Sequence, residues 1–86
     1  AVIGISGIET DGTLRDFDYR EVKVTQTILA HAREVWLAAD VSKFSRPAMV
    51  EVGTLAQIHR LFTDESPPAA FQALLDDAGV DVTVCA

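Results

Sequence analysis

Three polar residues follow a short apolar run near the middle of the chain. Asp40, Ser42 and Lys43 come directly after residues 35–39, whose sequence is VWLAA. An unbroken apolar run of this length predicts a strand covered on both faces, as in parallel α/β sheets. Side chains at the carboxyl end of such a strand lie at the rim where these sheets bind ligands. A carboxylate, a hydroxyl and a lysine at that rim suit a phosphorylated ligand, although a solvated loop would account for each residue taken alone.

A glycine-bearing segment near the start of the chain supplies a second group of candidates. Gly7, Asp11, Gly12 and Thr13 lie within residues 7–17, whose composition predicts a long loop. Glycines let backbone N–H groups approach an anion, and a threonine hydroxyl adds a further donor. The alternative is a surface loop whose glycines serve turns. Because the chain has neither a dinucleotide fingerprint nor a Walker motif, the pattern alone favours this alternative.

A third candidate, Glu21, lies in the first turn of an expected helix. Asp18 followed by Glu21 has the spacing of a capping box, which predicts a helix running to about Arg33. Glu21 and Lys23 are two residues apart, so they do not face each other on a helix. Glu21 either completes the cap near the positive helix end or points over the sheet rim toward a ligand hydroxyl. The spacing alone favours capping.

The remaining reactive residues do not form a pattern of their own. His31 and His59 lie far apart, with no cysteine or histidine at ligand spacing beside either of them. Cys85 is the single cysteine, has no base near it in sequence and cannot form an internal disulfide. We therefore expect no metal, no cofactor and no catalytic residue. A single cysteine also fits a reducing compartment, and we expect a cytoplasmic protein.

Periodicity and turn residues predict how the candidates are positioned. The order of elements is strand, helix, strand, short strand, strand, helix and strand, which indicates an α/β fold with a mostly parallel sheet and flanking helices. The second helix is expected to have Ser66 as N-cap, Pro67 at its first position and Gly79 just beyond its end. Alternation in the last strand predicts a place near a sheet edge. The expected strands are 2–6, 35–40, 48–52, 58–63 and 80–85, with one helical turn at 54–57.

Length and composition limit the functions that the chain can have. The chain of 86 residues is one small domain, with a hydrophobic fraction of 49% and a net charge of −6. Because lysine and arginine do not cluster anywhere, we do not expect this part of the protein to contact nucleic acid. No apolar run approaches the roughly 20 residues of a membrane span. The chain starts inside an apolar run without an initiator methionine, and we interpret it as a piece of a longer protein.

Five short motifs, taken in order, resemble those of one protein family. They are GISGIETDGTL from Gly4, REVK from Arg20, AADVSKF from Ala38, LFTD from Leu61 and GVDV from Gly79. Together they resemble the DeoR family of bacterial transcriptional regulators, and in particular the second half of its C-terminal ligand-sensing domain. The similarity covers nearly the whole chain. The Asp-x-Ser-Lys-Phe stretch is its most characteristic part, whereas Thr10, Asp11 and Val22 depart from the commonest family pattern.

The resemblance implies a sugar-phosphate-sensing domain of the ribose-5-phosphate isomerase and CoA-transferase-like superfamily. In such regulators an N-terminal winged helix-turn-helix binds DNA, so that unit and the first half of the sensor would lie outside these residues. The implied partners are a phosphorylated sugar or related metabolite and, through the missing domain only, DNA. We expect a homo-oligomer and no membrane partner. The resemblance and the residue patterns together give the expected ligand-binding residues, which are Gly7, Asp11, Gly12, Thr13, Glu21, Asp40, Ser42 and Lys43.

Two other functions stay open at this stage. The same motifs also resemble ribose-5-phosphate isomerase, in which Glu21 would move a proton while Lys43 stabilises an enediolate. Val22 separates the glutamate from its lysine, unlike the enzyme pattern, and the stretch after Lys43 resembles the regulators, so we prefer the regulator. The third function is an oligomerisation module, because unpaired sheet edges favour association between chains.

Overall fold

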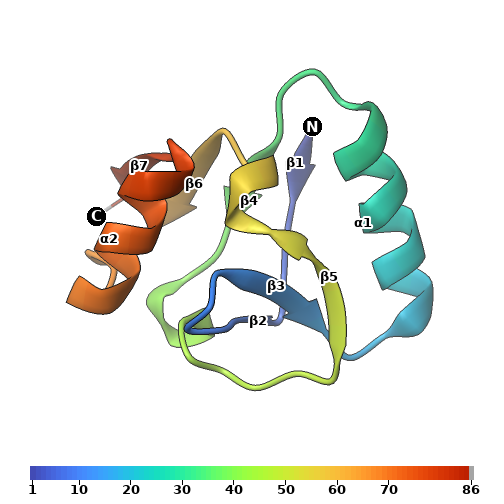
Figure 1. The fold of residues 1–86 in the computed structure, drawn as a ribbon, viewed down its shortest axis with the longest axis horizontal. Helices are drawn as coiled ribbons and strands as arrows, with labels where there is room; N and C mark the ends of the chain where they lie inside the picture. The colour runs from blue at the N-terminus through green and yellow to red at the C-terminus, as the bar shows by residue number, and fades with distance from the viewer. Residues whose placement is uncertain (86) are drawn as a thin grey trace.

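Two β-sheets of different kinds share one hydrophobic core. The computed structural model describes residues 1–85, and Figure 1 shows its fold. A parallel sheet has the strand order β1-β4-β6-β7, and a separate antiparallel sheet has the order β2-β3-β5. The helices are α1 (Tyr19–His31) and α2 (Ala69–Ala78), and the two short 3-10 segments are η1 (Val41–Lys43) and η2 (Leu55–Gln57). The strands are β1 (Val2–Ile3), β2 (Gly7–Ile8), β3 (Thr13–Asp16), β4 (Trp36–Ala38), β5 (Val50–Thr54), β6 (Arg60–Thr63) and β7 (Asp81–Val84).

The α/β class is confirmed, but the long loop predicted over residues 7–17 is wrong. This segment forms a hairpin in which β2 and β3 pair antiparallel, with Ile8 opposite Leu14. Both side chains are fully buried, and their burial in the shared core holds the hairpin in place. The chain reverses where the N–H of Gly12 donates to the carbonyl of Glu9 at 3.0 Å. A strand of only two residues is too short for its alternation to be read from sequence.

The antiparallel sheet also changes the position of the strand predicted at 48–52. It is β5, it begins two residues later, and it pairs with β3 rather than with a strand of the parallel sheet. The helical turn predicted at 54–57 is confirmed as η2. The strands predicted first, second, fourth and last are present in shorter form as β1, β4, β6 and β7. The prediction of a mostly parallel sheet therefore holds for four strands, and the other three form the second sheet.

The two helices begin in different ways. The carboxylate of Asp18 accepts a hydrogen bond of 2.8 Å from the N–H of Arg20, which confirms it as the N-cap of α1. The predicted cap of α2 is wrong, because its N-cap is Pro68 and no side chain caps it. Pro67 precedes Pro68, and the residue before a proline is disfavoured in helical conformation, so the helix begins beyond both prolines at Ala69. Gly79 ends α2 in a left-handed conformation, as predicted.

The parallel sheet has one covered face and one open face. Leu37 and Leu61, neighbours on β4 and β6, are fully buried on the face that packs against the antiparallel sheet and the helices. Ala38, which points the other way, is exposed, so the prediction that β4 is covered on both faces is wrong. An apolar run does not by itself tell which of its faces is covered. The last strand, β7, lies at the sheet edge as predicted.

None of the helices within residues 1–85 has the length and apolar character needed to cross a membrane.

Candidate functional site

A cavity of about 550 Å³ lies between β1 and α1. These two elements lie next to each other in Figure 1, and the chain passes through β2 and β3 between them. Because the first turn of α1 lies near the carboxyl end of β1, polar residues from three parts of the chain meet there. The apolar lining comes from β1 and from the later turns of α1. The polar lining residues are Ser6, Asp16, Arg20, Glu21 and Thr25.

Asp16 is fixed at the wall of this cavity. Its Oδ1 accepts a hydrogen bond of 2.8 Å from the Ser6 hydroxyl and one of 2.7 Å from the N–H of Phe17. The N–H of Ser6 in turn donates to the carbonyl of Arg15 at 3.2 Å. Arg20 and Glu21 are positioned by the first turn of α1, which Asp18 caps. A guanidinium, two carboxylates and two hydroxyls thus surround one opening, so that hydroxyl groups of a ligand can be bound by the carboxylates and an anionic group by Arg20.

Asp40, Ser42 and Lys43 do contact one another at the carboxyl end of β4. Asp40 is the N-cap of η1, where its Oδ1 accepts from the N–H of Ser42 at 2.9 Å and also from the Ser42 hydroxyl. Its Oδ2 lies 3.8 Å from Nζ of Lys43. The hydrogen bond from Ser42 lowers the pKa of Asp40 below its ordinary value. This local capping arrangement explains the positions of all three side chains.

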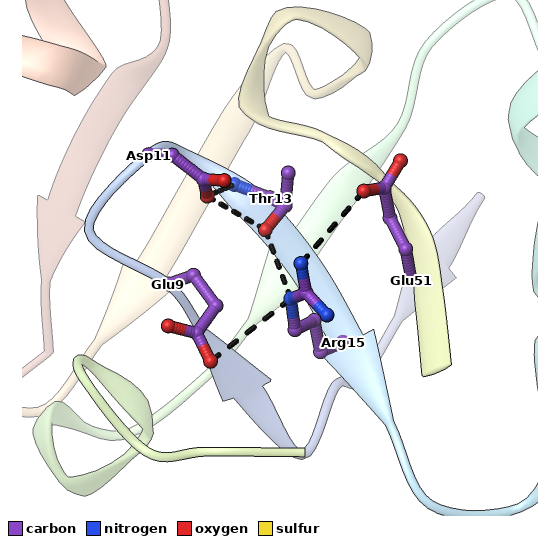
Figure 2. A network of polar contacts seen from close by, with 5 residues as sticks. All are labelled: Glu9, Asp11, Thr13, Arg15 and Glu51. Carbon is purple, nitrogen blue, oxygen red and sulfur yellow. Dashed lines mark hydrogen bonds and ion pairs between the residues drawn. The ribbon is translucent and has the colours of Figure 1, made fainter. Parts of the chain in front are cut away.

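Asp11 and Thr13, two of the predicted ligand residues of the hairpin, belong to another polar network, shown in Figure 2. Oδ1 of Asp11 accepts from the N–H and the hydroxyl of Thr13, at 3.0 and 2.7 Å, and the hydroxyl bond lowers the pKa of Asp11. Nε of Arg15 donates to the Thr13 hydroxyl at 3.1 Å. The Arg15 guanidinium also lies 3.9 Å from a carboxylate oxygen of Glu9 and of Glu51. This network links the hairpin to β5.

The hairpin and the segment after Lys43 are neighbours through their backbones. The N–H of Ser45 donates to the carbonyl of Ile8 at 2.8 Å, and Ile8 forms a parallel bridge with Phe44. Gly7 lies so close to this segment that a Cβ on it would be 2.1 Å from the carbonyl oxygen of Arg46. The expected proximity of the glycine-bearing segment to the Lys43 loop is therefore present in the backbone.

The eight predicted residues nevertheless lie in separate places. Of the eight, Glu21 lines the cavity beside β1. Asp40 lines a second cavity, of about 360 Å³, at the carboxyl ends of β4 and β6. The Thr13 hydroxyl is engaged by Asp11 and Arg15, whereas Lys43 pairs with Asp40. Thr13 and Lys43 thus do not contact each other through their side chains, and their ligand roles stay predictions.

Four polar residues of the first cavity are not among the predicted ligand residues: Ser6, Asp16, Arg20 and Thr25. The sequence pattern places Asp16 in a loop, although it ends β3, and includes Arg20 only in a family motif. The sequence feature that could identify Arg20 as a cavity residue is its position in the first helical turn directly before Glu21. Asp16 gave no comparable signal, because its partner Ser6 lies ten residues away and belongs to another segment.

The comparisons with known proteins decide the family. The family model described as the DeoR C-terminal sensor domain matches residues 1–65. The chain belongs to this family. It is 44% identical over 81 residues to the HTH-type transcriptional repressor CsqR of Escherichia coli K12, covering 94% of this chain and 31% of that protein. The expected resemblance to DeoR-family regulators is therefore confirmed.

Two further relatives are both named glycerol-3-phosphate regulon repressor. The chain is 39% identical over 84 residues to the glycerol-3-phosphate regulon repressor of Escherichia coli K12, covering 98% of this chain and 33% of that protein. It is 46% identical over 66 residues to the protein of that name from Haemophilus influenzae, covering 77% of this chain and 26% of that protein. The chain thus spans a quarter to a third of the length of these relatives. These relatives are named as transcriptional repressors and not as isomerases.

Proposed function

We propose that this chain is the effector-sensing part of a DeoR-type transcriptional repressor that responds to a phosphorylated sugar or polyol. Membership of the sensor-domain family supports a sensing role. The name of one relative, glycerol-3-phosphate regulon repressor, supports a small phosphorylated effector. In this proposal an N-terminal winged helix-turn-helix of the intact, cytoplasmic protein binds DNA, and the net charge of −6 fits a sensing part that leaves the DNA to that domain.

The cavity between β1 and α1 is the observation that carries the proposal. Its polar lining combines the cation of Arg20 with the carboxylates of Asp16 and Glu21. An arginine side chain offers donors in a planar fork that matches a phosphate group. Carboxylates accept hydrogen bonds from sugar or polyol hydroxyls, and the Asp16 carboxylate is already held in place by Ser6. The arrangement therefore suits a ligand that carries both hydroxyls and a phosphate.

Ligand binding would be signalled through the elements that carry the polar residues of the cavity. Arg20 and Glu21 belong to α1, Asp16 ends β3, and Ser6 follows β1, so a ligand that contacts all of them fixes these elements relative to one another. A ligand shifts a conformational equilibrium only through its different affinity for the two states. The state with α1 held against the end of β1 is the one that the effector would favour.

The test uses the intact repressor, its operator and glycerol 3-phosphate as the probe. Arg20→Gln removes the cation from the cavity but keeps the backbone N–H that Asp18 caps. We expect the concentration of glycerol 3-phosphate that half-releases the operator to rise roughly tenfold or more, because a charge-assisted hydrogen bond contributes about 1.5–3 kcal/mol. Operator affinity without effector should stay unchanged.

The matched control is Arg33→Gln, which removes the same charge at an exposed position beyond the end of α1. It should leave the response to glycerol 3-phosphate as in the unmodified repressor. Equal responses of the two variants would remove Arg20 from the site. If glycerol 3-phosphate, ribose 5-phosphate and other phosphorylated sugars all fail to release the unmodified repressor, the sensing proposal itself is wrong.

A further inference from the structure

The last strand of the parallel sheet, β7, has one free edge. It pairs with β6 on one side, with Leu61 opposite Val82 and Thr63 opposite Val84, and no strand within residues 1–85 pairs with its other side. Figure 1 shows β7 beside α2, at the end of the molecule opposite α1. All residues of β7 are exposed. A free strand edge is a template on which another strand can pair through its backbone.

The hydrogen bonds toward β6 show which backbone groups of β7 remain available. The N–H groups of Asp81 and Cys85 donate to backbone carbonyls on the β6 side, at 3.1 and 2.7 Å. Backbone groups of successive residues in a strand point to opposite sides, so Thr83 also faces β6, whereas Val82 and Val84 face away from it. The N–H and C=O groups of these two valines therefore lie at the free edge.

The side chains next to the free edge are apolar. Val82 and Val84 are 38% and 43% exposed, and both line a cavity of about 250 Å³ beside α2, together with Leu75. Strand edges are usually protected by lysine, proline or a bulge, but β7 has neither lysine nor proline, and its register with β6 is continuous. The edge thus offers unpaired backbone groups next to an incompletely covered apolar surface.

We infer that β7 pairs antiparallel with β7 of a second copy of this chain, across a two-fold axis at Thr83. In this register Val82 of one copy lies opposite Val84 of the other, and each such pair exchanges the N–H and C=O groups that face the free edge. The valines of both copies form one apolar patch beside α2. The two Thr83 side chains meet on the opposite face, a pairing that stabilises antiparallel sheets.

The free edge is complementary to itself in this register. An axis one residue earlier would require the N–H of Val80, which already donates to the carbonyl of Leu75 at 3.0 Å. With the axis at Thr83, Asp81 lies opposite Cys85 of the other copy. The two Asp81 carboxylates therefore do not face each other, which matters between copies that each have a net charge of −6. Self-complementarity is what a two-fold interface requires, and the inference does not depend on the effector.

Disulfide cross-linking in the intact protein tests this pairing. Thr83→Cys, combined with Cys85→Ser, places two thiols across the axis, where opposite Cα atoms are about 4.5 Å apart and within reach of a disulfide. Ala56→Cys with Cys85→Ser is the matched control, at an exposed position of η2. Non-reducing electrophoresis after mild oxidation gives the fraction of linked dimer. We expect this fraction to be roughly fivefold or more larger for Thr83→Cys, because paired thiols have a high effective concentration.

A second variant tests the register without changing position 83. Asp81→Cys, with the exposed native Cys85 kept, places these two thiols opposite each other between copies, so it should also form linked dimers. The unmodified protein should not, because its two Cys85 residues lie about 14 Å apart in this register. Linked dimer at Thr83→Cys no greater than at Ala56→Cys would overturn the inference. Equal cross-linking of Asp81→Cys and the unmodified protein would overturn it as well.

Discussion

The hydroxyl of Ser6 donates a hydrogen bond of 2.8 Å to Oδ1 of Asp16 and thereby joins the connection between β1 and β2 to the end of β3. The same oxygen accepts from the N–H of Phe17, at the entry to the connection with α1. This contact connects the parallel sheet, the antiparallel sheet and the first helix at the wall of the cavity. Its loss should therefore affect both stability and the shape of the cavity.

Ser6→Ala should lower the free energy of unfolding by about 1 kcal/mol, because it removes one donor to a partly buried carboxylate that remains in place. Urea denaturation measures this loss. The matched control is Ser66→Ala, because Ser66 is exposed and no side chain caps α2. That variant should change stability by less than about 0.5 kcal/mol. A larger loss at Ser66 than at Ser6 would contradict both the contact at the cavity and the corrected start of α2.

Gly7→Ala should destabilise the protein, whereas Gly4→Ala should not. A Cβ at Gly7 would lie 2.1 Å from the carbonyl oxygen of Arg46, a backbone atom that cannot move aside cheaply. We expect a loss of about 1–3 kcal/mol, as for other overpacked positions. A Cβ at Gly4 meets nothing within 4 Å, so that variant should be neutral or slightly stabilising. Thermal unfolding compares the two, and equal melting temperatures would contradict the close approach of β2 to the segment after Lys43.

The stability of the protein should fall as the pH decreases below 3.8, the ordinary pKa of an aspartate. Hydrogen bonds from Thr13 and Ser42 lower the pKa values of Asp11 and Asp40 in the folded state, whereas the unfolded chain titrates at the ordinary value. A lowered folded pKa stabilises the protein above the unfolded value, and this contribution disappears as the pH falls through the folded one. The double variant Asp11→Asn, Asp40→Asn should lose less stability over this acid range.

Urea denaturation at a series of pH values measures the slope of stability against pH. If the double variant and the unmodified protein have the same slope below pH 3.8, the carboxylates of Asp11 and Asp40 do not have lowered pKa values.

The elements that sequence predicted well are those specified by local signals. Asp18 and Gly79 are cap residues whose effect acts within one helical turn, and both mark helix ends in the structure. The apolar residues of β4 and β6 likewise identified two central strands. The sequence does not predict the hairpin because β2 has only two residues and because β3 is defined by its pairing with β2 and β5 and not by a local pattern.

The candidate site was harder to predict because it is assembled from segments that are separate in sequence. Glu21 was identified from its place in the first helical turn, and Asp40, Ser42 and Lys43 were correctly expected to meet, since they lie within four residues. The cavity, however, brings Ser6 beside Asp16 through the pairing of β2 with β3. Without that pairing, Asp16 and Arg20 cannot be assigned to the same opening as Glu21.

Lys43→Ala tests whether the rim of the parallel sheet takes part in effector binding. Lys43 does not line the cavity beside β1, and its Nζ lies 3.8 Å from Asp40, so its ligand role is a prediction from sequence. If it binds the phosphate of the effector, the variant in the intact repressor should need roughly tenfold more glycerol 3-phosphate to release the operator. If its role is only to pair with Asp40, the response should be unchanged and the loss of stability at most about 1 kcal/mol.

Lys23→Ala is the control for this substitution, because Lys23 is an exposed lysine of α1 whose Nζ lies 5.2 Å from the centre of the Tyr19 ring. Operator release and affinity without effector are measured for both variants by fluorescence anisotropy of labelled operator. Binding of phosphate at the rim predicts a weaker response for Lys43→Ala alone, with unchanged operator affinity. Identical responses of the two variants would leave the cavity between β1 and α1 as the place where the effector binds, since Arg20 is then the cation that faces it.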